Sequence, residues 1–152
     1  MPFIFTDYMS EICGRLSGVS HGIRISCNGQ TFEEDILFTH RGLSGPAALQ
    51  ISSYWKEGDY IAINLFPSHD VNLLITEAKN KSPKLLLRSF LNAFMSKALV
   101  AELESLLWSN FSEKPLAEWS KAEITLIADS LNNWLLKPSS TEGYRTAEVT
   151  LG

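Results

Sequence analysis

The order of apolar and polar residues near the start of the chain predicts a β-hairpin. Apolar residues occupy every second position of the segment 22–27 and therefore share one face of a predicted strand: Ile23, Ile25 and Cys27. The Asn28-Gly29 pair follows directly. This pair is typical of a tight hairpin turn, because both central residues of that turn adopt positive φ. We therefore expect the chain to reverse there and return as a second strand.

The return strand changes polarity along its length. It runs through residues 31–32 and again through residues 36–39, with the acidic residues 33–35 between the two parts. We expect this acidic triplet to form a bulge or an exposed kink. A third strand is predicted over residues 60–66, and Pro67 ends it because proline cannot donate to a sheet ladder.

Two short helices are expected between these strands. Thr6 is placed to cap a helix over residues 7–16, since a Thr hydroxyl can accept a hydrogen bond from a free first-turn amide. The Ser-Gly-Pro run at residues 44–46 predicts the start of a second helix over residues 47–55. Ser or Gly caps a helix well, and Pro is tolerated in the first turn. Gly58 marks the end of this segment.

From residue 70 onward the apolar spacing changes to the period of a helix. Asp70 is placed to cap a first helix, and Ser82-Pro83 to open a second. A third helix is predicted from the apolar stripe between residues 99 and 107. These segments form a part of the chain that is helical throughout.

The capping-box pair Ser120 and Glu123 predicts a fourth helix, because each side chain satisfies a free amide near the other residue. The apolar stripe of this helix continues to Leu135. A short polar linker at residues 139–143 then precedes a final predicted strand over residues 144–151.

The order of these elements predicts an α+β fold with two lobes. A single strand after four helices is not stable alone, so it is expected to rejoin the first sheet. The β-rich lobe then comprises residues 1–67 and 140–152, and an all-helical lobe of residues 68–139 is inserted into it.

Composition narrows the class of protein. The chain has 152 residues, a net charge of −4 and 45% hydrophobic residues, which is ordinary globular composition. The mild acidity argues against a nucleic-acid partner, which favours a basic surface. No apolar run reaches the roughly 18 residues of a membrane span, so no membrane partner is expected. Two cysteines and no visible signal peptide indicate a reducing, cytoplasmic location.

Candidate chemistry concentrates in the turn between a predicted strand and the second helix. The residues with functional potential there are Thr39, His40, Arg41, Gly42, Ser44 and Gly45. Free amides and the helix dipole favour an anionic group at such a point, and His40 and Arg41 would add donors or charge. Alternatively, the two glycines serve only a tight turn and Ser44 only caps the helix.

Two further chemical interpretations, a serine hydrolase and a metal site, have less support. Gly42-Leu43-Ser44-Gly45 matches the first four positions of a nucleophile elbow, which would make Ser44 the nucleophile of a hydrolase. The fifth position is Pro46, however, and no acidic residue is placed to orient a histidine. The histidines and cysteines have no metal-ligand spacing, so no metal is expected. The sequence identifies no catalytic residue.

The turn lies within a longer segment that resembles a known family. Residues 35–52 closely resemble a signature of the BaiN-like family of bacterial NAD(P)/FAD-dependent oxidoreductases, in which the block Leu-Phe-Thr-His-x-Gly-Leu-Ser-Gly-Pro lies in a domain inserted into the flavin-binding fold. The resemblance covers essentially the whole chain and is most specific over residues 36–46. The residues that match the block include Thr39, His40, Gly42, Ser44, Gly45 and Pro46, while Arg41 occupies its variable position. The family's dinucleotide fingerprint and its C-terminal glycine-rich segment have no counterpart in this sequence.

This resemblance implies a function for the turn. It implies a β-barrel-like lobe with a helical lobe, packed over the flanking flavin-binding domain of the same parent chain. The parent would use FAD, with NAD(P)H as a further candidate, and act on an unknown small-molecule substrate; no cofactor is expected on this segment alone. The turn from His40 to Pro46 would then face the flavin or substrate cleft.

The expected function is therefore that of an insert domain, inactive alone, that covers the cofactor and substrate of an oxidoreductase. The alternative is a self-contained, non-catalytic module that binds a partner through its helical lobe.

Overall fold

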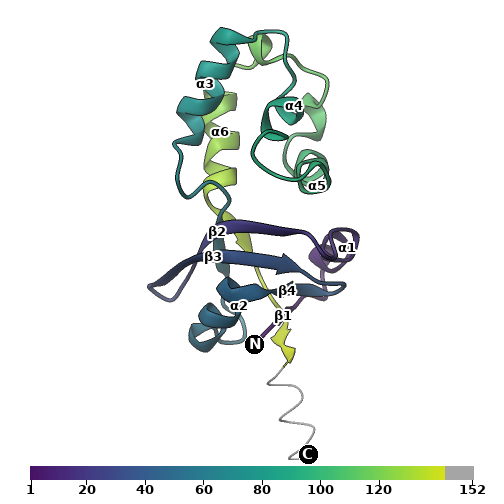
Figure 1. Cartoon of the computed structure of the whole chain (residues 1–152), viewed down its shortest axis with the longest axis vertical. Coiled ribbons are helices and arrows are strands. Elements are labelled where there is room, and N and C mark those ends of the chain that lie inside the picture. The colour runs from purple at the N-terminus through teal and green to yellow at the C-terminus, as the bar shows by residue number, and fades with distance from the viewer. Residues whose placement is uncertain (143–152) are drawn as a thin grey trace, which may run out of the picture. The chain divides into compact units, whose positions relative to one another are not determined.

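The computed structural model describes residues 1–142, which form two compact units (Figure 1). The β unit comprises Met1–Pro67 together with the segment from Asn133, and the helical unit comprises Ser68–Asn132. An antiparallel sheet in one unit and helices in the other confirm the α+β class.

The sheet of the β unit is barrel-like. Its strands within the described residues are β1 (Phe3–Ile4), β2 (Ser20–Cys27), β3 (Gln30–Phe38), β4 (Gly42–Ser44), β5 (Ile61–Asn64), β6 (Trp134–Leu136) and β7 (Ser140–Thr141). They pair antiparallel in the order β6-β5-β2-β3-β4-β1-β7. The outermost strands β6 and β7 follow each other along the chain, and the amide of Ser139 between them donates to the Ile4 carbonyl at 2.8 Å. Residues 134–141 thus connect the two edge strands directly, which gives the sheet a barrel-like form.

The predicted hairpin is confirmed. Asn28 and Gly29 have φ values of 49° and 79°, as the tight turn requires. The Asn28 side chain also donates to an Asp59 carboxylate oxygen at 2.7 Å, which ties the turn to the loop before β5. Ile23 and Ile25 of β2 are fully buried, so the alternating pattern identifies the inner face of the barrel correctly.

The predicted bulge at residues 33–35 is wrong. The register between β2 and β3 continues without a break through these positions. Glu33 lies opposite Arg24, and a guanidinium nitrogen of Arg24 donates to its carboxylate at 3.3 Å. The acidic side chains are exposed, so they are hydrated without disturbing the ladder.

Two helices belong to the β unit, α1 (Tyr8–Arg15) and α2 (Gly45–Ile51), and a 3₁₀ turn (Ser52–Tyr54) follows α2. Asp7 caps α1, since its carboxylate accepts a hydrogen bond from the Met9 amide at 3.0 Å. The prediction that Thr6 is the cap and that the helix includes residue 7 is therefore wrong by one position, and a carboxylate is the stronger acceptor at that place.

The helical unit contains α3 (Val71–Lys81), α4 (Leu87–Leu91), α5 (Lys97–Leu107) and α6 (Lys121–Asn132), with 3₁₀ turns at Ser109–Phe111 and Leu116–Glu118. Figure 1 shows α3 and α6 side by side. Asp70 caps α3 as predicted, accepting from the Leu73 amide at 3.1 Å. The core includes Trp119, whose ring packs edge-on against Phe111 at 5.3 Å between centroids.

Two helix boundaries differ from the prediction. Ser82-Pro83 does not open a helix, because α4 begins only at Leu87 and the preceding Leu86 pairs in extended form with Pro115. The fourth helix ends at Asn132 instead of reaching Leu135, because residues 134–136 pair with β5. A side-chain pattern alone does not distinguish these two uses of apolar residues.

The returning strand differs from the prediction as well. Part of the predicted linker, Ser140–Thr141, forms β7 and pairs with β1. The strand predicted over residues 144–151 lies outside the described residues.

Within the described part of the chain, none of the helices has the length and apolarity needed to cross a bilayer.

The capping box of α6 leads to a pH prediction. Glu123 accepts from the Ser120 amide at 2.8 Å and from Lys114 Nζ at 2.9 Å, and these bonds hold its pKa below the usual 4.5. Because the folded-state pKa is lowered, this stabilisation is present above pH 4.5 and is lost as the pH falls through the folded-state pKa.

Glu123→Gln should therefore flatten the fall in melting temperature between neutral pH and about pH 3, since the amide oxygen still accepts from Ser120 but does not titrate. Thermal unfolding followed by circular dichroism at several pH values measures this. Glu118→Gln, at an exposed position of the same unit, is the control and should leave the slope unchanged. Equal slopes for wild type and Glu123→Gln would contradict the prediction.

Candidate functional site

The predicted functional turn connects β3 to β4 in the β unit. The Thr39 amide donates to the Gly42 carbonyl at 2.9 Å, and the Phe5 amide donates to the Arg41 carbonyl at 3.0 Å. The main chain on both sides of His40 is thus fixed by hydrogen bonds to the turn itself and to the segment after β1. The turn is a rigid support for its side chains.

Two glycines allow the close packing around this turn. A Cβ at Gly42 would lie 1.8 Å from the Phe3 carbonyl oxygen, so strand β1 can approach only a glycine here. Gly45 has a φ of +88°, and a Cβ there would lie 2.9 Å from the Leu37 amide nitrogen. The structural explanation of both glycines, which the sequence left open beside the functional one, is therefore supported by direct contacts.

A hollow of about 200 Å³ lies beside the turn, and we call it the His40 pocket. The residues that line it are Pro2, Phe3, Ile4, Thr39, His40, Arg41, Gly42, Ser44 and Glu142. Five of the six turn residues singled out by sequence are brought together here, while Gly45 is not part of the lining. The apolar wall comes from the segment around β1, and the polar groups come from the turn and from Glu142.

Glu142 and residues 2–4 are members of the pocket that sequence reasoning missed. Glu142 follows β7, and its amide donates to the Pro2 carbonyl at 3.0 Å, which places it beside the turn. The pairing of β7 with β1 causes this approach across nearly the whole chain. Only knowledge of that pairing could have found Glu142, because no motif surrounds it.

The turn carries four polar side chains. Within residues 1–142, no hydrogen bond or ion pair involves the side chains of Thr39, His40, Arg41 or Ser44. The predicted position of Ser44 at the N-cap of α2 is confirmed, but its hydroxyl makes no capping hydrogen bond, so it does not act as a side-chain cap. These groups are available to a ligand.

The structure offers little support for the other sequence hypotheses. Ser44 has no hydrogen bond to a histidine among the described residues, which an activated serine nucleophile would need. His21 is used structurally, with its Nε2 3.0 Å from the Leu65 carbonyl oxygen, and His69 packs against Phe94. In the described part of the chain, no three His, Cys, Asp or Glu side chains lie together as a metal site.

Both cysteines are buried in the β unit. Burial and the nearby Asp7 raise the pKa of Cys13 to about 12, and burial with Asp59 raises that of Cys27. The thiolate is the reactive form, so neither cysteine is suited to nucleophilic chemistry.

We expect neither cysteine to be alkylated by iodoacetamide at pH 8 in the native chain. Both should react in guanidinium chloride, as counted by intact-mass spectrometry. Rapid native labelling would contradict the burial.

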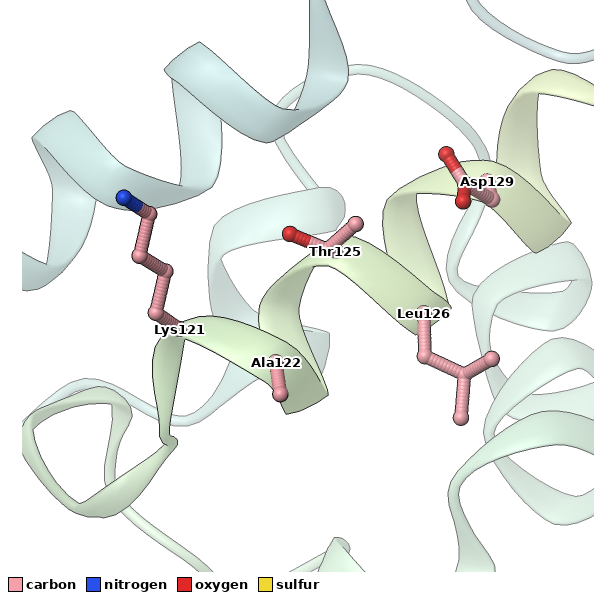
Figure 2. A pocket seen from close by; sticks show the side chains of 5 residues that line it. All are labelled: Lys121, Ala122, Thr125, Leu126 and Asp129. Carbon is pink, nitrogen blue, oxygen red and sulfur yellow. The ribbon is translucent and has the colours of Figure 1, made fainter.

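A second hollow lies on the helical unit and has a different character. Figure 2 shows its five lining residues along α6: Lys121, Ala122, Thr125, Leu126 and Asp129. It measures about 540 Å³ but is a shallow surface of one helix. Leu126 is 71% exposed, and the Thr125 hydroxyl accepts from the Asn72 side chain at 3.0 Å. No set of titratable groups converges here, so the His40 pocket is the better candidate for chemistry.

Comparison with known families decides the affiliation of the chain. Residues 1–149 match the family described as the HI0933-like protein barrel and H2TH domain. The chain belongs to this family. The barrel of the β unit agrees with that description, and the family is part of the flavoprotein-related group that includes the BaiN-like proteins. The resemblance of residues 35–52 to the BaiN-like family is therefore confirmed as far as membership of this flavoprotein-related group.

Two curated bacterial proteins are similar to the whole chain. The ribosomal RNA dihydrouridine synthase of Escherichia coli strain K12 is 40% identical over 153 residues, and the enzyme of the same name from Haemophilus influenzae is 38% identical over 156 residues. All of this chain is covered in both comparisons, but only 38% and 37% of the two relatives. The chain thus spans less than two fifths of the length of these proteins.

The names of these relatives correct one sequence prediction. The expectation of no nucleic-acid partner is wrong, because both relatives are named for ribosomal RNA. The prediction rested on the net charge of −4, which is an average over the chain. Recognition of a base depends on a few local groups, and an acidic average does not exclude them.

Proposed function

We propose that this chain is the barrel and helical part of a bacterial ribosomal RNA dihydrouridine synthase, and that the His40 pocket faces the cleft in which the uridine is reduced. The observation that carries this proposal is the 40% identity to the Escherichia coli enzyme over the full length of the chain. Ribosomal RNA as the substrate of the relatives also supports a cytoplasmic parent protein.

In this proposal FAD is bound outside this chain. The His40 pocket, at about 200 Å³, lies below the roughly 300–1,000 Å³ of pockets that enclose drug-sized ligands. FAD, with NAD(P)H as the source of its electrons, therefore belongs to the flanking flavin-binding domain of the parent protein in this proposal. The pocket has room for one ring-sized group of a substrate.

The part played by this chain is to shape the substrate side of the cleft. Its turn has a fixed main chain and uncommitted polar side chains, which is the arrangement expected of a preorganised binding surface. Pockets of this kind favour boundaries between domains. The insert domain would be inactive alone, because the reducing chemistry belongs to the cofactor.

The alternative of a non-catalytic interaction module is favoured by one observation. Leu126 on α6 and Leu73 on α3 are 71% and 53% exposed, which leaves apolar surface on the helical unit. Such exposed side chains are also common on ordinary protein surfaces, so this observation is weaker than the identity to the two enzymes.

A graft tests the proposed function. The segment of the Escherichia coli enzyme that aligns with this chain is replaced by residues 1–152, and the graft is expressed in a strain that lacks the enzyme. We expect dihydrouridine to return to the ribosomal RNA, as measured by mass spectrometry of its nucleosides. A stable, folded graft that restores none would overturn the proposal. It would favour the interaction module.

A further inference from the structure

We propose that the His40 pocket receives the uracil ring of the target uridine and recognises its hydrogen-bonding edge, with Arg41 and His40 donating to the carbonyl oxygens O2 and O4 and Glu142 accepting from N3–H. This inference rests on the proposed function and names the part of the substrate that the pocket binds. It assigns to Glu142, a residue outside the sequence motif, the role of distinguishing uracil from other bases.

The mixture of groups in the pocket excludes simpler ligands. A phosphate would benefit from Arg41 but would be repelled by the carboxylate of Glu142, and a metal cation would meet the opposite problem. A neutral ring that offers both acceptors and a donor satisfies all of these groups at once. Uracil presents two carbonyl oxygens on either side of one N–H, which is this pattern.

The pocket also provides the apolar wall that a base requires. Pro2 is the partly exposed residue of that wall, while Phe3 and Ile4 are 1% and 5% exposed and support it from the core. The Phe3 ring makes an edge-to-face contact with Trp55 at 5.7 Å between centroids. A base that enters such a pocket must first leave the stack of its RNA, and enzymes that modify bases read the extruded base by its Watson–Crick edge.

The donors and acceptors have the capacity to make these bonds. The side chains of Arg41 and His40 are exposed and make no hydrogen bond within the described residues, so binding breaks no internal contact of these side chains. A carboxylate accepts up to about four hydrogen bonds, so Glu142 retains capacity beside its existing interaction. The amide of Glu142 is fixed to Pro2, which limits the movement of the carboxylate.

The same groups disfavour cytosine. Cytosine has an amino group where uracil has O4, and an unprotonated N3 where uracil has N3–H. The amino group would face the donors Arg41 and His40, and the N3 lone pair would face the Glu142 carboxylate. Since neither contact is a hydrogen bond, the pocket is expected to reject cytosine by leaving polar groups unpaired.

The test compares RNAs that differ only at one base. The full-length graft is titrated with short single-stranded RNAs that carry one uridine, one N3-methyluridine or one cytidine, and binding is followed by fluorescence anisotropy. N3-methylation removes the donor that Glu142 accepts from. We expect uridine to bind about tenfold more tightly than either analogue, the ratio typical of one specific base contact.

Variants identify the residue responsible. Glu142→Ala should abolish the preference for uridine over N3-methyluridine, while Glu57→Ala, an exposed acid in the same unit, should retain it. Equal binding of the three RNAs by the unsubstituted graft would overturn the inference without any variant. The graft could still restore dihydrouridine in that case, so failure of the base pocket is distinguishable from failure of the proposed function.

Discussion

Gly42→Ala is expected to prevent stable folding of the β unit. The added Cβ would meet the Phe3 carbonyl oxygen at 1.8 Å and the Phe3 carbonyl carbon at 2.8 Å, and both are backbone atoms of a paired strand. Relief would require β4 to separate from β1, which also holds β7. We expect a loss of about 4 kcal/mol or more, in the range reserved for disrupted cores and strained backbones.

Urea unfolding of the purified chain measures this loss, and Gly58→Ala is the matched control. Gly58 has a φ of +96°, but nothing lies within 4 Å of a Cβ placed there. Its replacement should therefore cost only the strain of the left-handed conformation, about 1–2 kcal/mol. A Gly42→Ala chain as stable as Gly58→Ala would show that β1 and β4 do not pack as closely as described.

Arg41→Ala is expected to have the second large effect, on activity and not on folding. Arg41 lines the His40 pocket and makes no ion pair within the described residues, so its loss removes no structural contact of the side chain. A hydrogen bond to a charged group contributes about 1.5–3 kcal/mol, which corresponds to a tenfold to hundredfold loss of uridine reduction in the graft. The rate of dihydrouridine formation on ribosomal RNA is the measurement.

His40→Ala in the same graft should lower the rate as well, and Lys56→Ala is the control. Lys56 is an exposed cation of the β unit outside the pocket, so its removal changes the net charge equally. A loss of activity in Lys56→Ala similar to that in Arg41→Ala would indicate a general effect of charge. Unchanged activity in both Arg41→Ala and His40→Ala would remove the pocket from the reaction.

Much of the fold could be predicted from local chemistry. The hairpin at Asn28-Gly29, the Asp70 cap and the capping box at Ser120 and Glu123 all follow from hydrogen bonds between residues close in sequence. The residues that make these contacts can be identified in the sequence itself. Their prediction needs no knowledge of the distant parts of the chain.

The errors occurred where distant pairing decides the structure. Residues 134–136 carry the apolar spacing of a helix but pair with β5, and residues 42–44 resemble a turn but form a strand between β1 and β3. The chain gains more hydrogen bonds and burial from these pairings than from its local preference. The glycine at position 42 could be read from the sequence, but the close approach of β1 that requires it could not.

The candidate site also contains residues that local sequence identifies and one that only distant pairing brings in. The turn residues His40 and Arg41 could be selected from the sequence because they are polar groups clustered between glycines. Glu142 could not, because it joins them only through the pairing of β7 with β1 and its amide bond to Pro2. The expectation of no nucleic-acid partner failed because net charge was used in place of local geometry.

The central claim is that the protein containing this chain reduces a uridine in ribosomal RNA. Its most direct test is to delete the gene that encodes this chain in its own organism and to quantify dihydrouridine in the ribosomal RNA by mass spectrometry. We predict that dihydrouridine is lost at one site and returns when the gene is supplied on a plasmid. An unchanged dihydrouridine content after deletion would contradict the account.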